Sequence, residues 1–142
     1  LMYINQVYDK DKIQFQGSKQ YGTIYDNIIV ADLTFQLNEK NAIRTEWQTL
    51  QSKQDYKSWL AGLIEYSYSP NWFVAVSDQY NYGNEKSDHR IHYFNCFVGY
   101  TKDSHRITLG YGRQREGLFC VGGVCRQVPS SNGLTVSIST SF

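Results

Sequence analysis

The sequence predicts an all-β protein, an antiparallel up-and-down transmembrane β-barrel. One observation is that residues of alternating polarity recur along the whole chain, as in strands that present one face to an apolar environment. Another is that the connections alternate between short and long, as in outer-membrane barrels with tight periplasmic turns and longer extracellular loops. The length of 142 residues suits one domain, which we expect to span residues 1–142.

The composition agrees with strands that cross a membrane. The mean hydropathy of −0.51 is low. A membrane barrel keeps its mean hydropathy low because lipid-facing and lumen-facing residues alternate. The 12 Tyr, 7 Phe and 3 Trp fit both strands and the aromatic girdles of such barrels. No apolar run approaches the ~20 residues of a membrane helix. The net charge of +1 argues against a nucleic-acid partner, which would require a basic stripe.

Eight strands are predicted from the alternation. They cover residues 1–8, 27–37, 42–51, 58–68, 72–80, 90–100, 106–114 and 134–142. The last is the clearest, because Leu134, Val136 and Ile138 alternate with hydroxyl side chains. The strand over 72–80 has no clear polar face, so its facing stays open. Lengths near ten residues suit tilted strands that cross a bilayer.

The connections predict how the strands would lie in a membrane. Those at 9–26, 81–89 and 114–133 are long, the one at 52–57 is intermediate, and those at 38–41, 69–71 and 101–104 are tight. This alternation places the C-terminus on the periplasmic side of the cell outer membrane. Because the chain opens inside a strand, we expect it to be the C-terminal part of a larger barrel.

The C-terminal Phe142 ends an alternating strand, and it resembles the assembly signal of outer-membrane barrels. The expected partners are therefore outer-membrane lipid and the barrel-assembly machinery, with other envelope proteins as further candidates.

Five charged residues stand in mid-strand on the polar face. They are Asp32, Arg44, Glu46, Glu65 and Arg106. In a membrane barrel they would form a salt-bridge network that fills the lumen, because an unpaired buried charge is costly. The alternative within the same fold is a charged pore lining that selects solutes. In a soluble β-barrel they would be solvated surface residues around an apolar, ligand-binding interior.

Cys120 and Cys125 bracket the sequence Val-Gly-Gly-Val, which would let the chain turn back and bring the two sulfurs within bonding distance. We expect a disulfide that pins a hairpin within the longest extracellular loop, either to recognise a partner or to fold inward as a constriction. Metal binding would need more ligands, and a redox pair usually has C-x-x-C spacing. Cys96 is expected to face lipid or a neighbouring strand.

Arg113, Arg115 and Arg126 flank this loop. They form either a solvated rim that contacts lipid phosphates or Glu116, or a vestibule that attracts anions.

Catalysis is not expected. Ser87, Asp88 and His89 are consecutive in a polar loop, and adjacent loop residues rarely point at one another usefully. His105 lies at a predicted turn on the other side of the membrane from His89, and His92 follows the polar loop. We therefore predict no enzyme activity, no metal site and no cofactor.

The segment over residues 111–126, YGRQREGLFCVGGVCR, is followed by QVPSSNGLTVSISTSF. Together they resemble the C-terminal signature of an outer-membrane β-barrel family of Bacteroidota that is catalogued as a domain of unknown function. The R-x-E-x-Q of Arg44 to Gln48, the E-Y-S of Glu65 to Ser67 and the N-Y-G of Asn81 to Gly83 also match. The resemblance runs from about residue 28 onward. It implies an outer-membrane location and further strands before this chain, and it implies no activity.

The function predicted from the sequence is passive, either a porin-like channel or a structural subunit of an envelope complex. The alternative is a soluble β-barrel that binds a small apolar ligand.

Overall fold

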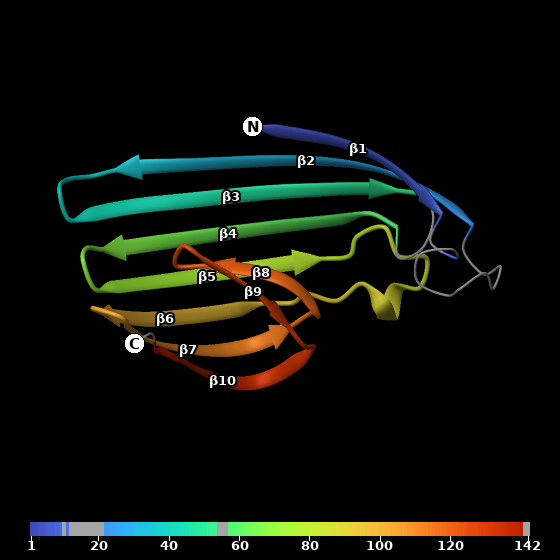
Figure 1. Cartoon of the computed structure of the whole chain (residues 1–142). Helices are drawn as coiled ribbons and strands as arrows, with labels where there is room; N and C mark the ends of the chain where they lie inside the picture. The colour runs from blue at the N-terminus through green and yellow to red at the C-terminus, as the bar shows by residue number, and fades with distance from the viewer. Residues whose placement is uncertain (10, 12–21, 54–56, 141–142) are drawn as a thin grey trace.

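A computed structural model describes residues 1–9, 11, 22–53 and 57–140. The chain forms one antiparallel sheet of eight strands and a separate two-stranded hairpin (Figure 1). The strands are β1 (Met2–Asp9), β2 (Thr23–Gln36), β3 (Asn41–Ser52), β4 (Trp59–Tyr68), β5 (Trp72–Tyr80), β6 (Asn95–Lys102), β7 (His105–Gln114), β8 (Gly117–Val121), β9 (Val124–Val128) and β10 (Ser131–Thr140). A 3₁₀ turn, η1 (Ser87–His89), follows β5. Within the described ranges, no helix is long and apolar enough to span a membrane.

The large sheet is a meander in the order β1-β2-β3-β4-β5-β6-β7-β10. This is the up-and-down order that the alternating sequence predicts, and the antiparallel all-β fold is confirmed. The sheet is open. Strands β1 and β10 are its two edges, and no pairing between them is found in the part of the chain that the structure describes. The described residues therefore form no closed barrel, and the larger barrel of which these strands would be the C-terminal part stays a prediction.

Cross-strand register gives the sheet two chemically different faces. One row of directly paired residues consists of Leu33, Thr45, Ile64, Val76, Cys96, Tyr111 and Leu134. The adjacent row on the opposite face consists of Thr34, Arg44, Glu65, Ala75, Phe97, Gly110 and Thr135. We call the face of the first row the apolar face and the face of the second row the polar face. The apolar face is exposed, as Leu134 at 73% exposure illustrates.

The predicted facing of most strands is confirmed, and the structure resolves that of β5. Its Val74 and Val76 lie on the exposed apolar face, whereas Phe73 and Ala75 are buried on the polar face. The reason is the hairpin of β8 and β9, which lies against the polar face and covers them (Figure 1). The predicted long loop over residues 114–133 is therefore largely strand that folds back over the sheet.

Two glycines on the polar face make room for the rings beneath the hairpin. A Cβ at Gly99 would lie 1.9 Å from the ring of Phe73, and one at Gly110 would lie 2.6 Å from the ring of Phe97. Each ring therefore lies across the neighbouring strand, at the position of a missing side chain. Phe73, Ala75 and Phe97 thus form an apolar patch within an otherwise polar face. We call this patch the seat, because the hairpin packs on it.

Candidate functional site on the polar face

The polar network begins on β2 and β3. The guanidinium of Arg44 donates to the carboxylate of Asp32, with Nη2 at 2.7 Å and Nε at 3.0 Å from Oδ2. It also donates to Glu46, which accepts a further hydrogen bond from the amide of Gln48. Charge-assisted pairs of this kind are stronger than neutral hydrogen bonds. The predicted association of Asp32, Arg44 and Glu46 is therefore present in the structure.

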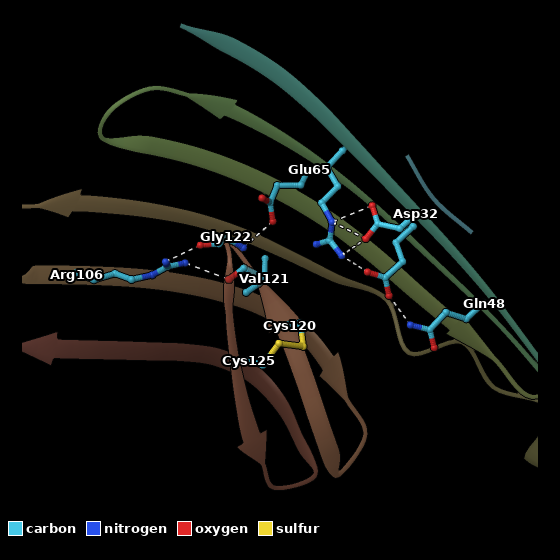
Figure 2. The surroundings of a disulfide bond; sticks show 10 residues. Asp32, Gln48, Glu65, Arg106, Cys120, Val121, Gly122 and Cys125 are labelled. Carbon is cyan, nitrogen blue, oxygen red and sulfur yellow. Dashed lines mark hydrogen bonds and ion pairs between the residues drawn. A yellow bond between two sulfur atoms is a disulfide. The ribbon is translucent and has the colours of Figure 1, made fainter. Parts of the chain in front are cut away.

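Glu65 and Arg106 both contact the tip of the hairpin, an interaction that the sequence did not predict. The backbone N–H of Gly122 donates to Oε2 of Glu65 at 2.6 Å. Arg106 donates from Nη1 to the carbonyl oxygen of Gly122 at 2.7 Å and from Nη2 to that of Val121 at 3.1 Å. Figure 2 shows the hairpin tip between these two side chains, which come from β4 and β7. Two of the five predicted charged residues thus hold the hairpin tip in place on the polar face.

The hairpin tip is a tight turn, whose backbone N–H and carbonyl groups contact Glu65 and Arg106. Gly122 and Gly123 have φ angles of +58° and +75°. A two-residue hairpin turn with positive φ at both central positions favours glycine, since L side chains are strained there. Cys120 and Cys125 are directly paired across the two strands, and the structure joins them by the predicted disulfide bond.

Apolar packing holds the body of the hairpin on its seat. Phe119, Val121 and Val128 of the hairpin are buried together with Phe73, Ala75 and Phe97 of the sheet. The rings of Phe97 and Phe119 are 5.1 Å apart at an angle of 39°. Burial of each such side chain stabilises the contact by about 1.5–3 kcal/mol. The hairpin thus packs on the polar face of the sheet, and both roles predicted for the pinned loop stay predictions.

Reduction of the disulfide is expected to loosen the hairpin without releasing it. The disulfide closes a loop of about six residues and so raises the free energy of the opened hairpin by about 2 kcal/mol. Reduction therefore lowers the free energy of local opening by that amount. Hydrogen–deuterium exchange of the β8 and β9 amides, before and after reduction, measures the change. The comparison uses the Cys96→Ala variant, which lacks the free thiol and so prevents its exchange with the disulfide. Unchanged exchange would mean that packing alone holds the hairpin.

The loop arginines lie near one end of the sheet. Arg115 lies over the ring of Trp59 at 4.2 Å, and Arg113 lies over the ring of Tyr93 at 5.2 Å. The two rings are themselves 6.0 Å apart. Arg113 belongs to β7 and Arg126 to β9, whereas Arg115 lies between β7 and β8. Sequence reasoning missed the aromatic partners of Arg113 and Arg115, because β4 and the segment before β6 are far apart in sequence.

The loops at this end are tied to one another. The N–H of Gly83 donates to the carbonyl oxygen of Ser58 at 3.0 Å. Lys57 Nζ donates to Glu85 Oε1 at 2.5 Å, and this contact lowers the pKa of the Glu85 carboxyl. Because the pKa is lowered in the folded chain, the pair contributes stability above the ordinary pKa of glutamate. The contribution is lost as the pH falls through the lowered value.

The histidines are spread over the sheet. His105 is paired with Lys102 at one end, whereas Ser87, Asp88 and His89 form η1 at the other. His92 contacts Asp78 at 2.6 Å. Among the residues described, no group of three His, Cys, Asp or Glu side chains is placed to hold a metal ion.

The two remaining residues singled out from the sequence are Cys96 and Phe142. Cys96 has a free thiol on the apolar face, where its Sγ donates to the carbonyl oxygen of Tyr111 at 3.4 Å. Phe142, the predicted assembly signal, lies outside the described residues.

These features define a class of protein, an open antiparallel sheet with an exposed apolar face and a polar face covered in part by a disulfide-bonded hairpin. The chain belongs to a family of unknown function, DUF6029, whose family model matches residues 1–142. No curated protein and no solved structure matches the chain.

Proposed function

We propose that this sheet is part of the wall of an outer-membrane β-barrel, a porin-like channel in which the hairpin of β8 and β9 is the constriction. The observation that carries the proposal is the distribution of chemistry between the two faces. A membrane barrel presents apolar residues to lipid and polar residues to its lumen. The hairpin and its charged anchors Glu65 and Arg106 lie on the polar face, where a lumen would be.

The aromatic residues of the apolar face support the same proposal. Trp72 and Tyr100 pack against each other near one end of the sheet, with ring centroids 4.7 Å apart. Tyr80 lies near the other end of β5, on the same face as Trp72. Their separation is about 27 Å along the strand at ~3.4 Å per residue. At a tilt of ~40° this becomes about 20 Å along the membrane normal, close to the ~25 Å band between aromatic girdles.

In the proposed barrel, β1 and β10 pair with further strands or with another copy of the sheet. Outer-membrane lipid would cover the apolar face, and the barrel-assembly machinery would be the partner during insertion. A soluble barrel for apolar ligands would instead need its apolar face inside. A cavity beside the hairpin includes Gln48, Gln79 and Gln114 in its lining, which supports a polar interior.

The test uses the full protein purified in detergent from its native membrane. We expect it to co-fractionate with the outer membrane and to give discrete conductance steps in a planar lipid bilayer. Recovery without detergent in the soluble fraction would instead support the soluble barrel. Outer-membrane recovery with no conductance, even after the hairpin is released, would support a structural subunit of an envelope complex.

A further inference from the structure

Two adjoining cavities lie near the end of the sheet where β5 and β7 lead into loops. The first, about 360 Å³, includes Gln48, Gln79 and Gln114 in its lining. The second, about 610 Å³, includes Asn81 and Asn84. Both volumes are in the range of ~300–1,000 Å³ typical of ligand sites. The cavities share the lining residues Trp59, Arg115 and Glu116, and we call the two together the loop-end cleft.

Two buried amides of the loop-end cleft have polar atoms without a partner. Gln114 is 5% exposed, and its Nε2 has no hydrogen-bond partner. Asn81 is 1% exposed, and its Oδ1 has none. An unsatisfied buried polar atom costs about 1–3 kcal/mol. No hydrogen bond fixes these two atoms. If the amide group rotates toward the adjoining cavity, its unpaired atom gains a hydrogen bond with a ligand there.

The charges of the loop-end cleft balance. The second cavity is lined by Arg113 and Arg115 and by Asp88 and Glu116. Of these four residues, only Arg115 and Glu116 line the first. Equal numbers of arginine and carboxylate side chains favour neither an anion nor a cation. This balance weighs against an anion-attracting vestibule, in which the arginines would stand alone.

The remaining lining is rich in amides and aromatic rings. An amide both donates and accepts, so it matches a hydroxyl group, which donates once and accepts twice. Asn95 is itself held in place, because its Nδ2 donates to the carbonyl oxygens of Tyr93 and Arg113 at 3.2 and 2.7 Å. The rings of Trp59 and Tyr93, tilted at 41° to each other, add partly apolar surface, with Arg115 over the ring of Trp59. A ligand with many hydroxyl groups, C–H surface and no net charge suits this combination.

We propose that the loop-end cleft binds a neutral oligosaccharide, with Gln114 and Asn81 as hydrogen-bonding residues and Trp59 as part of the apolar wall. This inference goes beyond the proposed channel, because equilibrium binding does not require that the barrel conduct.

Isothermal titration of the full protein tests the proposal. The protein is held in a detergent without a sugar headgroup, and the probes are linear neutral trisaccharides of glucose, galactose and mannose. A trigalacturonate of similar size is the charged control. We expect saturable binding of at least one neutral trisaccharide, tighter than that of the acidic one.

The variant Gln114→Leu is expected to weaken this binding about three- to tenfold, the worth of one hydrogen bond. Its thermal stability should be unchanged or higher, because the change removes an unsatisfied polar atom. Gln51→Leu is the matched control, since Gln51 is exposed and does not line either cavity. If Gln114→Leu lowers the thermal stability, Gln79→Leu, at a less buried lining position, replaces it.

Three results would overturn the proposal. They are the absence of saturable binding by every neutral trisaccharide, equal affinities of the lining variant and Gln51→Leu, and tighter binding of the acidic trisaccharide. In the first case, ordered water would be what satisfies the two amides.

Discussion

The Gly122→Ala variant is expected to release the hairpin from the polar face. A Cβ at this position would lie 2.1 Å from Nη2 of Arg106 and 2.7 Å from the ring of Phe73. Arg106 can move away only by giving up its hydrogen bonds to the hairpin tip, and the ring of Phe73 lies in the seat itself. With the strain of positive φ added, we expect the hairpin contact to lose about 3–5 kcal/mol.

Gly123→Ala is a closely matched control for this experiment. Gly123 also has positive φ, at +75°, but nothing lies within 4 Å of the position of its Cβ. It should therefore show only the backbone strain of about 1–2 kcal/mol. Limited proteolysis of β8 and β9 measures release of the hairpin, and planar-bilayer conductance measures its effect on flux. For a constriction, conductance should rise several-fold in Gly122→Ala alone. Equal proteolysis of the two variants would refute the role of the tip contacts.

The Phe97→Ala variant is expected to destabilise both the sheet and the hairpin, by about 3–5 kcal/mol. Phe97 is 4% exposed, fills the space left by Gly110 and contacts Phe119. Its removal would leave a cavity between two layers that cannot easily collapse, because β-sheet pairing keeps the neighbouring strands apart.

The control for Phe97→Ala is Phe94→Ala, three residues earlier. Phe94 is 53% exposed, so the same change should alter the free energy of unfolding by no more than about 1 kcal/mol. Urea unfolding in detergent, followed by tryptophan fluorescence, measures both variants. Similar losses in the two would mean that Phe97 is not part of a packed core.

The strand faces could be predicted from sequence wherever the two faces differ in chemistry. In β10, Leu134 and Val136 alternate with hydroxyl side chains, and in β3 Arg44 and Glu46 alternate with apolar residues. The pattern fails in β5, where Phe73 is as apolar as Val74. The reason is that a tertiary contact, the seat of the hairpin, requires apolar residues on an otherwise polar face.

The candidate site was only partly predictable. Local sequence shows the Val-Gly-Gly-Val turn and the cysteine pair, because both depend on neighbouring residues. The contacts of Glu65 and Arg106 with Gly122 join positions far apart in sequence, and no local pattern reports them. The same holds for Gln114 and Asn81, which are ordinary polar residues until the fold buries them.

The two edges of the sheet affect how the proposed barrel would assemble. In an edge strand of an antiparallel sheet, alternate residues direct their N–H and C=O groups away from the partner strand. Strand β10 has 10 residues and β1 has 8, so several backbone groups on each edge would be unsatisfied in hydrocarbon. Each such group costs several kcal/mol in lipid. For the proposed barrel, the eight strands therefore cannot enter the bilayer first and find their neighbours later. In such a barrel, pairing of β1 and β10 with their partners and insertion into the bilayer would have to occur together.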